Sequence, residues 1–309
     1  MTTIESQLIT KKMAKLLLRL PIFYIIFPLS LHQPTASYSI GINYGTVADN
    51  LSPPSQVAAF IKSQTTVDKV KIFDSNPDIL CAFANSSIAV TVADGDIPSI
   101  AKLPAAQSWI SRNILPFYLQ TQIRRIAVGN EIIATADKTL IAHLLPAMKL
   151  LRSALHLAGI TNVQVSTPHS LGILSTSDVP SSGRFRPTFD RVILAPILEF
   201  HRQTKSPFMV CPYPFFGFTD QTLNYALFKP NGGVLDKSTG LNYTNMLDAQ
   251  LDAVHSAMKR LGYGDMDIVL AETGWPSAGD RVRQVLAWTM RRRIMGTLLG
   301  TSAPEKALR

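Results

Sequence analysis

The sequence predicts an α/β fold, namely a (β/α)8 TIM barrel of parallel strands that is incomplete at its C-terminal end. Short apolar runs alternate seven times with helix-like segments, which is typical of a parallel sheet covered by helices. Residues 38–280 number 243, close to the ~250 of an eight-fold barrel. The alternative, an open doubly wound sheet, usually carries a glycine-rich phosphate turn after its first strand, whereas the turn at 43–47 holds one glycine.

Seven strands are expected because each run is short, apolar and rich in valine and isoleucine, as buried parallel strands are. They span 38–44, 69–74, 88–93, 124–129, 162–167, 208–213 and 267–271. Helices are expected between them. The first opens at Pro53 or Pro54, since proline suits a first helical turn. Others span 76–84, 104–114, 139–158 and 245–261, and glycines 159 and 262 end the last two. Cys81 falls in one of these helices, where we expect it to be buried.

The two ends of the chain are basic, whereas its body is neutral. Residues 1–37 carry a net charge of +3 and residues 281–309 a net charge of +6, which leaves zero for residues 38–280 out of the total of +9. The body therefore has no overall field that would steer a polyanion. We expect a neutral substrate and no nucleic-acid partner, and we interpret residues 281–309 as a divergent basic tail.

Residues 1–37 are predicted to be a signal peptide. Three lysines precede the apolar stretch 16–31, which one arginine and two prolines interrupt. A membrane span needs ~20 apolar residues, so this stretch is short and broken for one, and an uncleaved anchor is the alternative. Small residues at 35–37 favour cleavage near Ser37. We expect a secreted protein, extracellular or in the cell wall, with no stable membrane span.

Two glutamates stand where predicted strands end. Glu131 follows the strand at 124–129, and Glu272 follows the strand at 267–271. In a parallel barrel all such ends open onto the face that carries the chemistry. Two carboxyl groups converging there suit the cleavage of a glycosidic bond, one as proton donor and one as nucleophile. The alternative for Glu131 is that it complements the dipole of the following helix.

Residues suited to sugar recognition stand near these glutamates. The amide of Asn130 suits a sugar hydroxyl, and the plane of Trp275 suits the C–H face of a sugar ring, although an ordinary buried tryptophan is the alternative. Asp94 is either a turn residue or a substrate contact. The predicted substrate-binding residues are Tyr44, Asp94, Asn130, Tyr213, Phe216 and Trp275.

No metal or cofactor is predicted. His169 stands near the end of the fifth strand, but the six histidines of the chain show no metal-ligand spacing. We therefore expect His169 to be structural.

Seven motifs occur in order between residues 40 and 277. They are IGINYG (40–45), KVKIFD (69–74), IAVGNE (126–131), VSTPHS (165–170), YPFF (213–216), NMLDAQ (245–250) and AETGWPS (271–277). Together they resemble the plant β-1,3-glucanases of glycoside hydrolase family 17.

The resemblance implies a (β/α)8 barrel, secretion, and endo-hydrolysis of β-1,3-glucans with retention of configuration. By match to the family motifs, Glu131 would be the proton donor and Glu272 the nucleophile, and Tyr44, Asn130, Tyr213 and Trp275 would line the cleft. The expected partner is a β-1,3-glucan, either callose-like or from a fungal wall, which suits a role in plant defence. We expect a monomer.

The chain departs from the family pattern at three places. The family usually has asparagine where this chain has Asp94, and commonly has it where this chain has Cys211. Residues 281–309 do not match the last helix and eighth strand of the family. A barrel without its eighth strand leaves two open edges, which invites aggregation. The alternatives are therefore a catalytically impaired β-glucan-binding cell-wall protein from a truncated transcript, or a product that does not accumulate.

Overall fold

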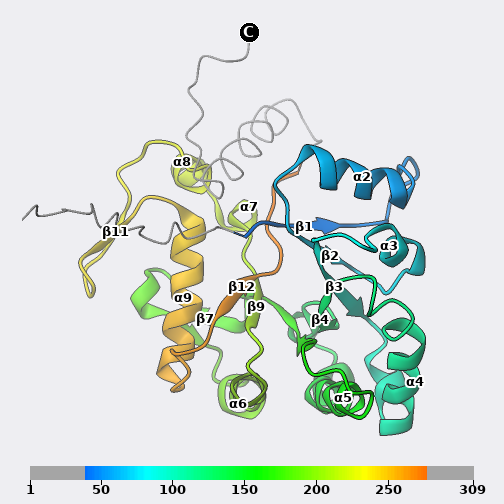
Figure 1. Ribbon diagram of the computed structural model, residues 1–309. Helices are drawn as coiled ribbons and strands as arrows, with labels where there is room; N and C mark the ends of the chain where they lie inside the picture. The colour runs from blue at the N-terminus through cyan, green and yellow to red at the C-terminus, as the bar shows by residue number, and fades with distance from the viewer. Residues whose placement is uncertain (1–38, 277–309) are drawn as a thin grey trace, which may run out of the picture. The chain divides into compact units, whose positions relative to one another are not determined.

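The computed structural model describes residues 39–276 (Figure 1). The predicted signal peptide at 1–37 and the predicted tail at 281–309, in which no eighth strand is expected, lie outside these residues. No helix between residues 39 and 276 is long and apolar enough to cross a membrane.

Parallel strands form the centre of the described region. Five of them pair in the order β1 (Gly41–Tyr44), β2 (Lys69–Ile72), β3 (Ala89–Asp94), β4 (Ile123–Val128) and β5 (Gln164–Ser166). Three more pair in the order β6 (Pro168–Ser170), β9 (Phe208–Cys211) and β12 (Ile268–Leu270). All seven predicted strands are confirmed, each within three residues of its expected ends.

The fifth predicted strand extends further than expected and changes partner on the way. Its first part, β5, pairs with β4, and its second part, β6, pairs with β9. The change occurs at Thr167, just before Pro168, which has no N–H to donate to a ladder. The chain thus passes from one sheet into the other at this point. Within the described residues no ladder joins β12 to β1, so these two strands are the outer members of the series.

Helices alternate with the strands and lie around them (Figure 1). They are α2 (Pro54–Gln64), α3 (Pro77–Ala82), α4 (Leu103–Asn113), α5 (Lys138–Leu157), α6 (Ala195–Thr204), α7 (Pro214–Gly217), α8 (Leu223–Ala226) and α9 (Met246–Arg260). Short 3-10 turns are η1 (Ile97–Ile100), η2 (Ile132–Thr135), η3 (Leu171–Ile173), η4 (Pro180–Ser182) and η6 (Asp220–Thr222), and η5 (Asp190–Leu194) is a π-helical turn.

Two antiparallel pairs were not predicted. They are β7 (Leu174–Thr176) with β8 (Arg184–Phe185), and β10 (Val234–Asp236) with β11 (Leu241–Tyr243). Each strand in them has two or three residues, which is too short for a period-two pattern to be recognised.

Side-chain caps explain where the predicted helices begin. The Asp137 carboxylate accepts from the backbone N–H groups of Thr139 and Leu140, at 2.8 and 3.1 Å, at the start of α5. The Asn245 side chain accepts from the N–H of Asp248 at 2.9 Å at the start of α9. Such caps satisfy N–H groups that have no partner inside the helix. Each cap thus fixes the entry into a helix that packs on the strands.

The core lies between the strands and the inner faces of the helices. Helix α5 buries a stripe that includes Leu144, Met148, Leu151 and Leu155, as its amphipathic pattern predicts. A second cluster gathers around Phe208 of β9. The prediction for Cys81 was wrong: α3 buries Ile79 and Leu80, and Cys81 is exposed on the other side of this short helix.

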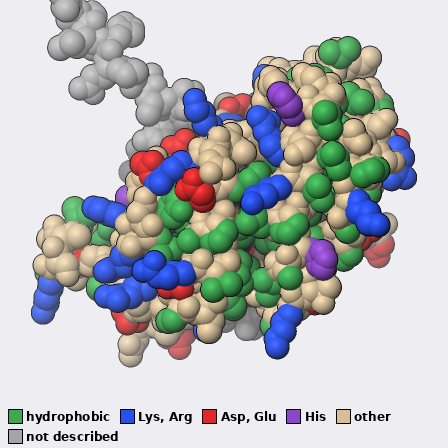
Figure 2. Space-filling model, turned by 90° about the horizontal axis from the view of Figure 1, so that it is seen from below, with side chains coloured by type: hydrophobic (Ala, Val, Ile, Leu, Met, Phe, Trp, Pro, Cys, Tyr) green, Lys and Arg blue, Asp and Glu red, His purple; other side chains and the backbone are tan. Residues whose placement is uncertain are grey.

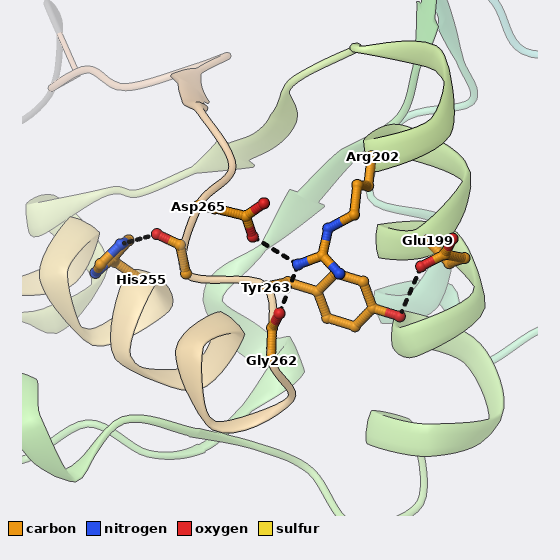
Figure 3. A network of polar contacts seen from close by, with 7 residues as sticks. Glu199, Arg202, His255, Gly262, Tyr263 and Asp265 are labelled. Carbon is orange, nitrogen blue, oxygen red and sulfur yellow. Dashed lines mark hydrogen bonds and ion pairs between the residues drawn. The ribbon is translucent and has the colours of Figure 1, made fainter.

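A polar network connects the end of α6 to the segment before β12 (Figure 3). The guanidinium of Arg202 donates to the Asp265 carboxylate and to the carbonyl of Gly262, and it lies 4.3 Å from the centre of the Tyr263 ring. Tyr263 in turn donates to the carboxylate of Glu199 at 3.3 Å. These contacts hold in place the segment that leads into β12, and Glu272 stands two residues after that strand.

Candidate active site

Glu131 stands at the end of a strained turn after β4. Its backbone is left-handed, with φ at 52°, and Gly129 before it has φ at 65°. The N–H of Gly129 donates to the carbonyl of Asp94 at 2.6 Å, and the N–H of Glu131 donates to the carbonyl of Pro168 at 3.0 Å. A left-handed conformation is unfavourable for a residue with a side chain, and such strain gathers at functional sites. The neighbouring strands thus hold Glu131 in a fixed orientation.

Glu272 follows β12 and is held by two partners. Its Oε1 forms an ion pair with Nζ of Lys71 at 2.6 Å, and only 8% of the Lys71 side chain and 11% of the Glu272 side chain are exposed. Its Oε2 accepts from the hydroxyl of Tyr213 at 3.1 Å. Both carboxylate oxygens are therefore engaged, which fixes the side chain and compensates for the burial of its charge.

The two glutamates line one cleft, with a volume of about 510 Å³. Its walls come from the ends of β4, β6, β9 and β12 and from α7 and α9. The lining residues are Glu131, Ser170, Leu171, Cys211, Tyr213, Phe216, Gly217, Gln250 and Glu272. The predicted convergence of the two carboxyl groups at the C-terminal ends of the strands is therefore present in the structure.

The two carboxyl groups lie in different surroundings. Burial raises the pKa of Glu131, and the negative charge of Glu272 raises it further, while Cys211 and Lys71 oppose this rise. Glu272 has the lysine and the tyrosine as direct partners instead. A carboxyl group with a raised pKa beside an ion-paired carboxylate is the arrangement that suits a proton donor beside a nucleophile.

Tyr213 is a hydrogen-bond donor in this site. Burial raises the pKa of its hydroxyl, and the charge of Glu272 raises it further. The hydroxyl therefore keeps its proton and donates a hydrogen bond to Glu272.

Aromatic rings form one side of the site. Phe216 lies 5.4 Å from Tyr213 between ring centres and is 78% exposed. Trp275 lies 5.0 Å from both Phe215 and Phe218. Phe216 thus presents an open ring at the cleft, whereas Trp275 packs within the aromatic group.

The other predicted residues lie nearby but not on the cleft wall. Asn130 is exposed and accepts from Lys71 at 3.4 Å, so it shares a cation with Glu272. Tyr44 is buried at the end of β1, and burial raises its pKa. Asp94 is buried at the end of β3, where it accepts from the N–H of Asp96 at 3.1 Å, and burial raises its pKa. Binding roles for these residues and for Trp275 stay predictions.

His169 is not among the residues that line the cleft. It is buried, its ring stacks on Phe208 at 4.8 Å, and burial lowers its pKa to about 3. Its imidazole is therefore neutral. Between residues 39 and 276, no group of three or more His, Cys, Asp or Glu side chains is placed to hold a metal ion.

Lys71 and four of the lining residues were not predicted from the sequence. Lys71 stands inside an apolar strand, and a lysine there signals a buried partner because a buried charge needs one. Ser170 ends β6, Leu171 lies in a 3-10 turn, and Gly217 and Gln250 lie on helices. None of these four carries a comparable signal.

The chain matches the family model described as glycosyl hydrolases family 17 over residues 40–290. It is 49% identical over 253 residues to a glucan endo-1,3-beta-glucosidase of Triticum aestivum, covering 80% of this chain and 55% of that protein. It is 44% identical over 273 residues to glucan endo-1,3-beta-glucosidase 7 of Arabidopsis thaliana, covering 85% of this chain and 54% of that protein. The chain thus spans about half the length of these relatives.

The fold matches solved structures of similar proteins. One is CJP38, a beta-1,3-glucanase and allergen of Cryptomeria japonica pollen, with a TM-score of 0.80 and 38% identity, covering 87% of this chain and 86% of the other. Another is a structure of plant beta-glucan endohydrolases with distinct substrate specificities, with a TM-score of 0.76 and 29% identity, covering 83% and 84% of the two chains.

Proposed function

This chain belongs to the glycosyl hydrolases of family 17, and from that premise we propose that it hydrolyses internal bonds of β-1,3-glucans with retention of configuration. One observation carries the proposal. Glu131 and Glu272 line the same cleft, and their surroundings favour a protonated Glu131 beside an ion-paired Glu272. The similarity to glucan endo-1,3-beta-glucosidases supports the choice of substrate.

The proposed mechanism is a double displacement. Glu131 protonates the glycosidic oxygen while the Glu272 carboxylate attacks the anomeric carbon, which gives a glycosyl-enzyme and frees the other fragment with a new hydroxyl group at its non-reducing end. Glu131, now a base, then takes a proton from water, and this water releases the sugar from Glu272. The mechanism predicts a separation of about 5–5.5 Å between the two carboxyl groups.

The aromatic residues are proposed to hold the glucan. The open ring of Phe216 offers a plane for the apolar face of a sugar unit, and Tyr213 lies between this ring and Glu272. Trp275, Asn130, Tyr44 and Asp94 are proposed to complete the binding surface near the strand ends.

Reducing-end release from a soluble β-1,3-glucan tests the proposed reaction. The full chain is compared with Glu272→Gln, and Glu199→Gln is the matched control, because Glu199 lies in the network of Figure 3 rather than on the cleft wall. We expect release by the parent and by Glu199→Gln, and a loss of at least about 1,000-fold in Glu272→Gln. NMR then gives the anomeric configuration of the product first released, and an inverted anomer would contradict the double displacement.

Binding by the inactive variant separates the enzyme from a glucan-binding protein. Removal of the nucleophile spares the aromatic rings, so Glu272→Gln is expected to retain affinity for the glucan. A folded parent that binds the glucan and releases no reducing ends would favour the non-catalytic alternative.

Secretion to the extracellular space or cell wall is also proposed. The three lysines followed by the apolar stretch at 16–31 support it. Expression in plant cells and N-terminal sequencing of the exported protein test this. A first residue near Tyr38 is expected, and retention of the protein inside the cell would contradict the proposal.

A further inference from the structure

A second cavity lies at the opposite end of the strands from the proposed active site. Its volume is about 330 Å³, at the lower end of the range of small-molecule pockets. It opens where β5, β9 and β12 begin, and the last turn of α6 forms one of its walls. Arg125, His201, Lys205 and Asp267 are among the residues that line it.

Arg125 of β4 brings a positive charge to this cavity without an acidic partner. Its Nη2 donates to the side-chain oxygen of Gln164 at 2.7 Å, and its Nε is buried with no hydrogen-bond partner among residues 39–276. The ion pairs of this part of the chain do not include Arg125, whereas Lys71 of β2 is paired with Glu272. Because a charge removed from water needs compensation, Arg125 requires an anion that the described residues do not supply.

His201 adds a second buried nitrogen to the lining. Its side chain is fully buried on α6, and its Nε2 has no hydrogen-bond partner in the described region. Burial, together with the nearby His169 and Arg125, lowers the pKa of His201 to about 3, so the ring is neutral. Its Nδ1 lies 2.9 Å from the hydroxyl of Ser206, which lies 2.7 Å from that of Thr204. Such a chain of hydroxyl groups can run in either direction, so Ser206 can donate to Nδ1 and leave the ring proton on Nε2.

The charged side chains of the cavity leave an excess of positive charge. Arg202 and Asp265, both drawn in Figure 3, pair with each other at 2.5 Å. Lys205 and Asp267 are exposed and of opposite charge, and neither forms an ion pair within residues 39–276. The three cations and two carboxylates of the lining therefore leave one positive charge, that of Arg125. A cation beside two buried N–H groups suits an anion with several acceptor oxygens.

We propose that this cavity binds a small oxyanion between Arg125 and His201, either free phosphate or the phosphate group of a phosphomonoester. Arg125 supplies the charge and donates from Nε, and the neutral imidazole of His201 donates from Nε2. Phosphate suits the cavity because its oxygens can accept from both groups at once while another oxygen faces Lys205 at the open side. The site lies at the other end of the strands from the cleft, so the inference does not depend on the hydrolysis of glucans.

Isothermal titration calorimetry of the full chain with sodium phosphate, glucose 6-phosphate and glucose tests the proposal. Arg125→Gln removes the charge and should weaken the binding of both phosphates by at least about tenfold. Arg124→Gln is the matched control, because this neighbour on β4 is exposed and does not line the cavity, and its affinity should stay within about twofold of the parent. Tighter binding of the ion or of the ester identifies the source of the phosphate. Dissociation constants above about 10 mM for both, or equal losses in the two variants, would overturn the proposal.

NMR of the parent chain gives a second test that needs no substitution. Its histidines are labelled with nitrogen-15 and assigned through bonds to the backbone. Phosphate should shift the Nε2 signal of His201 along the same saturation curve as the calorimetry, whereas His143 of α5, outside the cavity lining, should not move. Saturable binding with no shift at His201 would place the anion elsewhere and overturn the proposal.

Discussion

Lys71 is the residue that balances the charge of the site. It forms a 2.6 Å ion pair with Glu272 and also donates to Asn130, and its Nζ lies 3.9 Å from the centre of the Phe73 ring. A buried cation at this distance lowers the free-energy cost of burying the Glu272 carboxylate. It also connects β2 to the segment that follows β12, which is far from β2 in the sequence.

Substitution of Lys71 by methionine is expected to destabilise the fold. The change leaves the Glu272 charge buried without its cation, which costs about 3–5 kcal/mol in the free energy of unfolding. Lys69→Met on the same strand is the control, because Lys69 pairs with Asp68 at 3.8 Å with about half of each side chain exposed, and such pairs contribute at most about 1 kcal/mol. Urea unfolding followed by circular dichroism measures both. A loss in Lys71→Met no larger than in the control would contradict a compensating role for the ion pair.

At the scale of single residues, the sequence predicts those site residues that directly follow a predicted strand. Glu131 and Glu272 were predicted to lie in one site because each follows an apolar run, and parallel strands bring such positions to one face. Lys71 and Gln250 were missed, since one lies within a strand and the other on a helix. Their importance depends on which elements pack together, and no local pattern carries that information.

The turn between β4 and η2 is the element that orients Glu131. Gly129 lies in it with φ at 65°, and a Cβ atom there would come within 2.4 Å of Cγ1 of Ile132 and 2.9 Å of Cδ1 of Ile97. Ile132 directly follows Glu131, so a side chain at position 129 would push on the residue next to the proposed proton donor. The glycine thus allows both the backbone angle and the close approach.

Gly129→Ala is expected to cost more than the backbone angle alone. Gly159, at the end of α5, has φ at 74°, and a Cβ atom added there would meet nothing within 4 Å, so Gly159→Ala carries only the left-handed penalty of about 1–2 kcal/mol. Gly129→Ala adds the overlap with two isoleucines, a further ~1–3 kcal/mol. The rate of reducing-end release by Gly129→Ala should also fall by at least about tenfold, because a shift of the turn displaces Glu131. Thermal unfolding and activity measure both variants, and equal losses in the two would refute the argument from close packing.

At the scale of elements, long periodic segments were predicted and short irregular ones were not. Helix α5 has twenty residues, a capping aspartate and a terminal glycine, so its pattern decides its structure locally. The β7–β8 and β10–β11 pairs are stabilised by contacts with residues that are distant in the sequence. For example, the Asp236 carboxylate of β10 accepts from the N–H and the hydroxyl of Ser181, both at 2.7 Å. Such contacts join residues 55 positions apart, and no local period signals them.

At the scale of the molecule, the order of the strands follows from their order in the sequence. Each central strand pairs with its predecessor along the chain, as expected for consecutive β/α units. The sequence predicts this series, and the match to solved family structures confirms the fold. The break at Thr167, where β5 passes into β6, was not predicted because both parts are extended and only their partners differ.

The net charge of the chain is concentrated at its two ends. Residues 38–280 carry 19 basic and 19 acidic side chains, and the face seen in Figure 2 carries its Lys and Arg side chains at several separate places. Steering of a substrate by the field of a protein needs net charge on both partners, and salt at 0.15 M screens exposed charges beyond about 8 Å.

A β-1,3-glucan is neutral, so kcat/KM for it should change by less than about twofold between 20 and 300 mM NaCl. A carboxymethylated glucan is the matched comparison, because residues 281–309, with a net charge of +6, attract it at low salt. A steep fall of kcat/KM with salt for the neutral glucan would mean that charge outside the neutral body takes part in its capture.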